Sequence, residues 1–244
     1  MTSSAQRAVR VFAGASVALV FVLLPHPSRA DEPAPELMAR LAASATHIEA
    51  MRTRVNYTID GRLESLDGEG QTDSVTELLA RVDADGKNTK LVVLKYVEDG
   101  EDKTSEGQKT ARDTAEKRRD PKRQIHMPTL AEQQPRYEFD QVEVDKADPT
   151  RVRITFKPKV AADDTVEGSG WVDTRTGTVV SAGFKLSRPP MFIDYVHFTV
   201  EFAAPTPIGP LVSKVNVEGK GGLWFLFRQH FRAEAKLSAF RVVP

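Results

Sequence analysis

The side chains that could carry chemistry in this sequence are separated histidines and a few acidic residues. His47, His126, His197 and His230 stand alone, far apart along the chain. Zinc proteases place two histidines on one helix face, as in HExxH, and no such pair occurs here. An isolated histidine is more often an ordinary surface or hydrogen-bonded residue than a base or a ligand. The sequence therefore predicts no metal site and no histidine catalyst.

The acidic residues give no stronger signal. Asp83-Ala84-Asp85-Gly86 resembles the start of a calcium loop, but no glutamate stands where that loop needs one, and a hairpin turn explains the same residues. Asp173 and Asp194 could pair across strands, yet such a pair is expected by chance among 34 acidic residues. The GxSxG, GxxxxGK[ST] and complete GxGxxG patterns are also absent. We expect no catalytic residue, no cofactor and no enzyme activity.

Composition excludes further classes of function. The chain has no cysteine, which excludes disulfides, thiol catalysis and the lipid-modified N-terminal cysteine of a bacterial lipoprotein. Its 34 basic and 34 acidic residues balance. A near-neutral chain lacks the basic surface that nucleic-acid binding requires.

The first thirty residues have the pattern of a cleavable export signal. Arg7 and Arg10 precede an uncharged apolar run over residues 11–24, and Ser28-Arg29-Ala30 resembles a small-residue cleavage site. The run is shorter than the roughly 20 residues that a membrane-spanning helix needs. We therefore expect a signal peptide over residues 1–30, a periplasmic protein without stable membrane insertion, and one domain over residues 31–244.

An amphipathic helix should begin this domain. Leu37, Leu41, Ala45, Ile48 and Met51 recur at spacings of three or four residues, which places them on one face of a helix. A helix of this length is marginal alone in water. Its apolar face should therefore dock on the sheet predicted for the rest of the chain.

Most of the remaining chain alternates apolar and polar residues with the period of a β-strand. The clearest hairpin joins Trp171-Val172-Asp173 to the stretch that begins at Thr178, through a turn whose Gly177 can adopt a positive φ. The expected strands cover residues 55–66, 72–82, 89–97, 136–144, 151–157, 165–171, 178–186, 196–202, 211–217 and 223–243. Ten or eleven antiparallel strands are more than a flat sheet carries, so we expect one highly curved sheet in a mainly β, α+β fold.

Residues 98–131 interrupt this pattern. Sixteen of the 26 residues from Glu98 to Arg123 are charged, and a charged helical turn is expected over residues 111–119, ended by Asp120-Pro121. The segment then becomes apolar, with Met127 and Leu130. A long excursion in a compact domain is usually a lid, a partner site or disordered. We take Met127 and Leu130 as lid candidates.

The pattern GxxWVDxxTGxVVxxxF, ending at Phe184, and the final strand over residues 239–243 resemble the LolA/LolB-like superfamily of bacterial periplasmic proteins. The resemblance covers nearly the whole predicted domain. It implies a half-barrel with helices over its concave face, and a soluble, monomeric carrier of a lipid or lipoprotein acyl chain in lipoprotein sorting to the outer membrane. It also implies an alternative, an RseB-like envelope-stress sensor or scaffold that acts through membrane-protein or other protein partners. The family's characteristic arginine stands in an Arg-Pro-aromatic context. Its nearest counterpart by position is Arg81, which is followed here by Val82-Asp83. We take Arg81 as a candidate polar latch.

An apolar concave face of this kind must be covered by the protein's own helix or by a ligand. The candidate ligand-binding residues on it are Leu91, Val93, Phe184, Leu186, Phe198, Val200, Phe202, Phe225 and Phe227.

Overall fold

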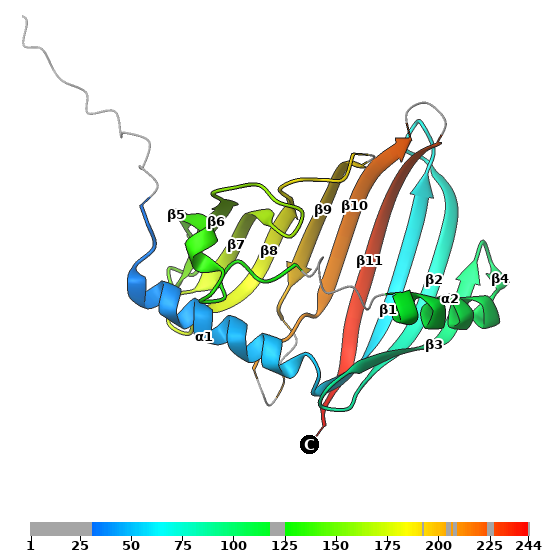
Figure 1. Cartoon of the computed structure of the whole chain (residues 1–244), viewed down its shortest axis with the longest axis horizontal. Helices are drawn as coiled ribbons and strands as arrows, with labels where there is room; N and C mark the ends of the chain where they lie inside the picture. The colour runs from blue at the N-terminus through cyan, green and yellow to red at the C-terminus, as the bar shows by residue number, and fades with distance from the viewer. Residues whose placement is uncertain are drawn as a thin grey trace, which may run out of the picture.

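The computed structural model describes residues 31–117, 125–191, 193–203, 206, 209–223 and 227–243. The predicted signal peptide lies outside these residues, so it stays a prediction. The described chain forms one 11-stranded sheet in the order β4-β3-β2-β1-β11-β10-β9-β8-β7-β6-β5, and every pairing is antiparallel. The end strands β4 and β5 do not pair with each other, so the sheet is open and curved (Figure 1). This confirms the fold class expected from the alternating pattern.

Ten of the described strands overlap those expected from the sequence, whereas the short β4 in the charged excursion was not expected. Their bounds are β1 Val55–Leu66, β2 Thr72–Ala84, β3 Thr89–Glu98, β4 Glu101–Asp102, β5 Tyr137–Val144, β6 Arg151–Pro158, β7 Val166–Asp173, β8 Thr178–Leu186, β9 Ile193–Glu201, β10 Lys214–Leu223 and β11 Phe227–Val242. The first and last long strands, β1 and β11, pair in the middle of the sheet. This long-range pairing divides the sheet into a part formed by β5–β11 and a part formed by β1–β4.

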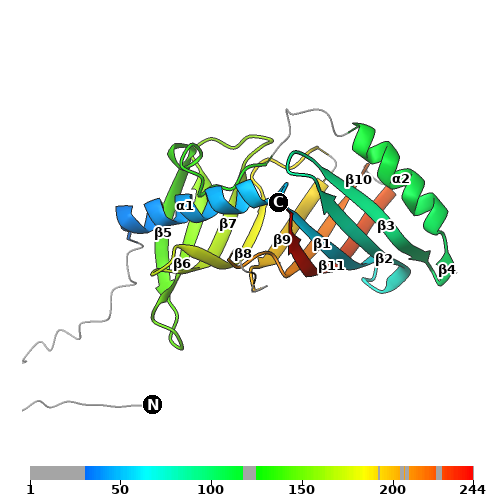
Figure 2. The same cartoon turned by 90° about the horizontal axis from the view of Figure 1, so that it is seen from below.

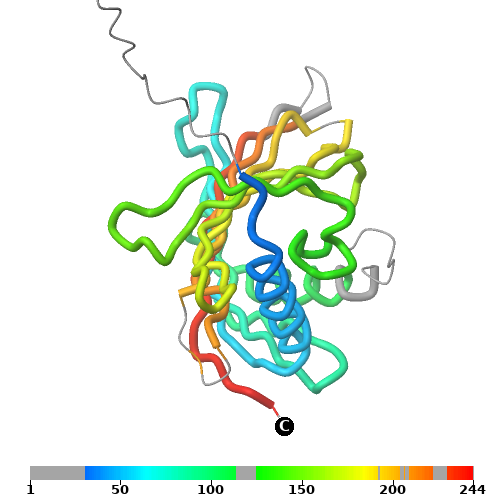
Figure 3. Tube along the Cα trace, turned by 90° about the vertical axis from the view of Figure 1, so that its left-hand side faces the viewer, coloured from blue at the N-terminus to red at the C-terminus, as the bar shows by residue number. Residues whose placement is uncertain are grey.

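Two helices lie on the same side of the sheet, here called the helix side (Figure 2). Helix α1 (Pro35–Met51) begins with a proline, whose fixed φ suits the first helical position. It buries Leu37, Leu41 and Ala45, which confirms the docking face predicted from its spacing. Figure 3 shows α1 (blue) against one side of the sheet. Leu37 and Leu41 share a core cluster with Val152 and Ile154 of β6.

The hairpin turn between β7 and β8 supports α1. Gly177 has a φ of 68°, and a Cβ atom there would lie 2.5 Å from the Arg40 carbonyl carbon. The glycine therefore serves two purposes: it permits the left-handed conformation, and it lets the turn approach the helix backbone closely.

The charged excursion contains a longer helix than expected, α2 (Thr104–Lys117), where the sequence predicted a helical turn over residues 111–119. It lies over β3 at the far end of the sheet from α1 (Figure 1). A Cβ atom on Gly107 would lie 2.7 Å from the Cβ of Tyr96, so only a glycine allows this contact. Gln108 Nε2 also donates a hydrogen bond to the carbonyl oxygen of Val93. Neither helix, among the residues described, has the length and hydrophobicity that crossing a membrane requires.

Candidate functional site

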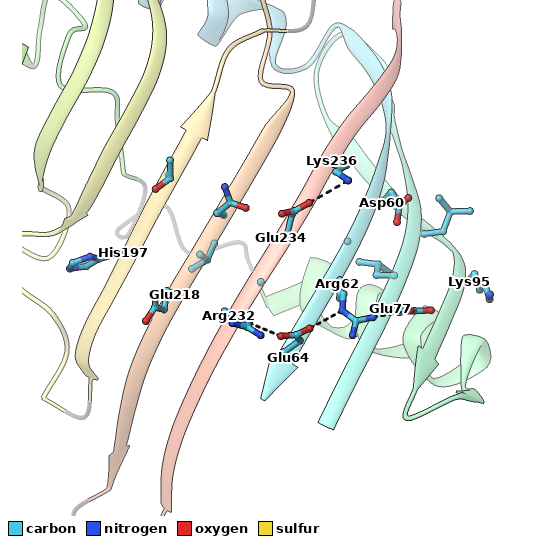
Figure 4. A pocket seen from close by; sticks show the side chains of 17 residues that line it. Asp60, Arg62, Glu64, Glu77, Lys95, His197, Glu218, Arg232, Glu234 and Lys236 are labelled. Atoms are coloured by element: carbon cyan, nitrogen blue, oxygen red, sulfur yellow. Dashed lines mark hydrogen bonds and ion pairs between the residues drawn. The ribbon is translucent and has the colours of Figure 1, made fainter. Parts of the chain in front are cut away.

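Two hollows, which lie on opposite faces of the sheet, differ in chemistry. The face without helices carries a broad groove of about 950 Å³ across β9, β10, β11, β1, β2 and β3. Its side chains are mainly charged (Figure 4). The helix side carries a smaller cavity of about 260 Å³ with an apolar lining.

The charges in the groove bind one another. Glu64 accepts hydrogen bonds from both Arg62 and Arg232 (Figure 4), and these bonds hold the pKa of Glu64 below its usual value. Arg62 also bonds Glu77 at 3.2 Å. Exposed pairs of this kind contribute little to stability, but they leave few of these charges available to a ligand. We regard the groove as a solvated surface.

A polar cluster lies at one end of this face. Tyr195 donates a hydrogen bond from its hydroxyl to Glu218 at 3.1 Å and lies 3.3 Å from His230 Nε2. Desolvation and the bond to Glu218 raise the pKa of Tyr195. A tyrosine that acts as a base or nucleophile needs its pKa lowered, so this environment works against that role. No group of three or more potential metal ligands occurs within the described part of the chain.

The apolar cavity lies between the sheet and a roof. The roof consists of Leu41 of α1 and residues 125–129, and the floor consists of strands β5 to β9. The register places Phe139, Phe156, Phe184 and Phe198 in one row across the floor, with Gly168 among them. The residues that line the cavity are Leu41, Ile125, His126, Met127, Pro128, Thr129, Phe139, Ile154, Phe156, Val166, Gly170, Val172, Val179, Ala182, Phe184, Val200 and Phe202.

Burial differs along the cavity and is deepest beneath α1, although Phe156 of β6 is half-buried. At β6 and β7, Ile154 and Val172 are each 3 % exposed. At β8 and β9, Phe184, Val200 and Phe202 are only half-buried. The cavity is therefore closed beneath α1 at β6 and β7 and opens towards β9.

A glutamine side chain joins the two parts of the roof. Gln134 lies in a 3-10 helix, η2 (Gln134–Arg136), and its Nε2 donates hydrogen bonds to the carbonyl oxygens of Met38 at 3.0 Å and Thr129 at 2.9 Å. Two residues further on, Arg136 forms two hydrogen bonds with Asp164, and these lower the pKa of the Asp164 carboxyl. These contacts fix residues 125–136 against α1 and the end of the sheet.

The structure brings four of the predicted site residues to this cavity: Phe184, Val200, Phe202 and Met127. Phe198 stacks on Phe184 with ring centroids 5.2 Å apart.

The other candidates lie elsewhere. Leu186 does not line the cavity, although its cross-strand partner Val166 does, and Leu130, 4 % exposed, belongs to the core. Leu91 and Val93 lie on β3, where Val93 is buried near α2. Phe225 lies outside the described residues, and Phe227 begins β11.

Arg81 does not reach the cavity. It follows the fully buried Ala80 on β2, so its side chain points to the face without helices. There it bonds Asp83 at 2.7 and 2.9 Å. The sequence of β2 already indicated this orientation of Arg81, because the apolar Ala80 and Val82 on either side of it must occupy the buried face.

Several lining residues were not among the candidates, and they carry recognisable signals. Ile154 and Phe156 belong to a stretch of strict alternation on β6, and Leu41 belongs to the apolar stripe of α1. Gly170 and Ala182 are too small to attract attention in a sequence, although their size leaves the cavity open.

No protein-family model matches the sequence, and no curated protein matches it. Among solved structures, the chain is similar to a LolA superfamily protein from Nitrosomonas europaea, with 8 % identity, 85 % of this chain and 94 % of that chain covered, and a TM-score of 0.36. It is also similar to a DUF1329 family protein from Desulfovibrio piger, with 11 % identity, coverage of 84 % and 92 %, and a TM-score of 0.41. A third match is MucB in complex with MucA, with 12 % identity, coverage of 87 % and 100 %, and a TM-score of 0.25.

The first of these structures is named as a member of the LolA superfamily, which the sequence resembles. All three TM-scores are below 0.5.

Proposed function

We propose that this protein is a periplasmic binding protein that carries a hydrophobic ligand, the hydrocarbon chain of a lipid or lipoprotein, in the cavity beneath α1. One observation carries the proposal: the helix side of the sheet holds a roofed cavity with an almost entirely apolar lining and an open end at β9. Such a cavity favours a ligand that offers hydrocarbon and needs no charged partner.

The size of the cavity supports a modest affinity. At roughly 30 Å³ per group, the volume of a water molecule in the liquid, 260 Å³ accommodates about nine methylene groups. Each buried methylene contributes about 0.8 kcal/mol, so the chain gains about 7 kcal/mol before the cost of ordering it. This corresponds to a dissociation constant of about 10 μM at best. Such reversible binding suits a ligand that the protein must later release.

The lining favours binding over reaction. His126 is the one titratable side chain among the described residues that line the cavity. General acid-base or nucleophilic chemistry needs a second positioned group, such as a base beside a nucleophile. The lining provides no such pair.

The periplasmic location depends on the predicted signal peptide. Intact-mass measurement of protein recovered from the native envelope should show a chain that begins at Asp31. A chain that retains residues 1–30 would contradict the export prediction.

A pair of neighbouring substitutions tests the binding site. Val200 lines the cavity, whereas Thr199, the residue before it on β9, is exposed on the opposite face. Val200→Glu should abolish uptake of a fluorescent fatty acid, because an unpaired carboxylate in an apolar cavity disfavours hydrocarbon beside it. Thr199→Glu adds the same charge and should leave uptake unchanged.

Two results would count against the carrier proposal. Wild-type protein that takes up no fatty acid, and that yields no lipid when extracted from its native envelope, would refute it. Equal loss of uptake in both variants would place the bound chain outside the cavity. If the lipid-free protein also retained a protein partner in pull-down experiments, the sensor or scaffold alternative would gain support.

A further inference from the structure

The floor of the cavity contains a row of unequal side chains that sets its depth. The strand register aligns Ile154, Gly170, Ala182 and Val200 across β6, β7, β8 and β9. Gly170 and Ala182, in the middle of this row, project at most one carbon into the cavity. In the neighbouring row the same four strands carry Phe156, Gly168, Phe184 and Phe198, three of which are aromatic. The empty volume therefore lies above the two small residues.

The direction of this volume follows from the exposure of its walls. The end at β6 and β7 is buried beneath Leu41, which is 1 % exposed, and belongs to the same core cluster as Val172. The end at β8 and β9 is half-buried. A chain that enters at β9 passes over Ala182 and then Gly170 before it meets the closed end, which Ile154 of β6 and the neighbouring Val172 form. It therefore lies across the strands, with its methyl end innermost.

We propose that the cavity selects a single unbranched hydrocarbon chain by length, and that Ala182 and Val172 set the limit. The proposal rests on the proposed function and adds the class of ligand. The volume of 260 Å³ accommodates about nine carbons, so it fits one chain segment and excludes two chains side by side. The path from β6 to β9 spans three strand spacings, about 14 Å in all, which suits a linear group and not a ring system.

Two further features support a fixed limit. Gly170 cannot be exchanged freely, because a Cβ atom there would lie 3.0 Å from the carbonyl oxygen of Ser181. The closed end is part of the buried core, so it cannot recede to admit further carbons without disrupting that core. Chain beyond the limit must remain outside the mouth at β9.

Three variants test the limit, and each predicts a different shift. Ala182→Val adds two carbons over the path and should shorten the longest fully bound chain by about two carbons. Val172→Ala removes two carbons at the closed end and should lengthen it by about two. Ser181→Val makes a similar change at the position before Ala182. The side chain of residue 181 points to the other face of the sheet, so this variant should not change the length of the longest bound chain.

The measurement is the dissociation constant for straight-chain fatty acids of six to sixteen carbons, obtained by isothermal titration calorimetry with wild-type protein and each variant. Affinity for the wild type should rise about fourfold per methylene, the factor equivalent to the transfer free energy of one buried methylene, and then level off near nine carbons. The affinity should reach its plateau at about seven carbons in Ala182→Val and at about eleven carbons in Val172→Ala. Because the second variant gains length, a general loss of folding cannot produce the predicted pattern.

The outcomes separate this inference from the proposed function. Wild-type protein that binds none of the fatty acids refutes the proposed function and the inference together. Wild-type binding that rises without a break through sixteen carbons, or a break at the same length in all four proteins, refutes the length limit and leaves the carrier function standing.

Discussion

The contact between the β7–β8 turn and α1 gives a prediction whose size follows from the structure. Gly177→Ala places a methyl group on a residue with a φ of 68°, and that methyl group would lie 2.5 Å from both the carbonyl carbon and the Cβ of Arg40. A left-handed conformation costs a non-glycine residue about 1–2 kcal/mol. Forcing an atom into backbone that cannot move aside costs a further 1–3 kcal/mol, roughly. The expected loss in the free energy of unfolding is about 2–5 kcal/mol.

Gly86→Ala is the matched control. Gly86 has a φ of 86°, and a Cβ atom on it would have no neighbour within 4 Å. This variant should therefore lose only the conformational part, about 1–2 kcal/mol. Urea denaturation of both variants, followed by circular dichroism, measures the difference. The difference between them isolates the contact with α1.

The effect on ligand binding should follow the same contact. A turn pushed away from Arg40 displaces α1, which supplies Leu41 to the roof of the cavity. Gly177→Ala should weaken fatty-acid binding, whereas Gly86→Ala should leave it unchanged. Equal losses of stability in the two variants, or unaltered binding in Gly177→Ala at a concentration where it is folded, would refute the reasoning.

Two further predictions concern the roof and the end of the sheet. Gln134→Leu keeps the volume of the side chain but removes both hydrogen bonds that join residues 125–129 to α1. The closed roof should lose about 1–2 kcal/mol of stabilisation, so bound fatty acid should dissociate about 5–30 times faster in stopped-flow experiments. Gln133→Leu is its control, since the side chain of Gln133 accepts a hydrogen bond from Arg136 and, within the part of the chain that the structure describes, does not bond α1. An equal acceleration in this variant would contradict the role of Gln134. Asp164→Asn should lower stability by about 0.5–1 kcal/mol at neutral pH, because the partly exposed carboxylate loses its charge-assisted bonds with Arg136. Those bonds lower the pKa of Asp164 in the folded protein, so their contribution to stability is complete above the ordinary value of 3.8 and disappears as the pH falls through the lower folded value. The difference in stability between wild type and variant should therefore vanish in strong acid. A difference that stays constant with pH would contradict this cause.

Local patterns in the sequence were sufficient to predict most of the elements. Strict alternation marked β6 and β8, and the stripe through Leu37 and Leu41 marked α1, because both patterns follow from the periodicity of a single element. The turn at Gly177 was predicted for its φ. Its second role, the close approach to α1, depends on a residue more than a hundred positions away and could not be read locally.

The candidate site was predicted only in part, because the order of strands depends on long-range pairing. Val93 and Phe184 both occupy the helix side, and both were placed on one binding surface. The pairing of β1 with β11 puts β3 and β8 six positions apart in the sheet. Helix α2 therefore lies over Val93, whereas Phe184 lines the cavity. Helix α2 is strongly polar, and its close packing on β3 depends on a long-range contact of Gly107 with Tyr96.

The most direct test of the central claim is an isotope-filtered nuclear Overhauser spectrum of the protein with a ¹³C-labelled fatty acid. If the chain occupies the cavity, its methylene protons should show contacts with the methyl groups of Met127 and Val200, and none with Leu79, which lines the groove on the opposite face. Contacts with Leu79 and none with Met127 or Val200 would contradict the account.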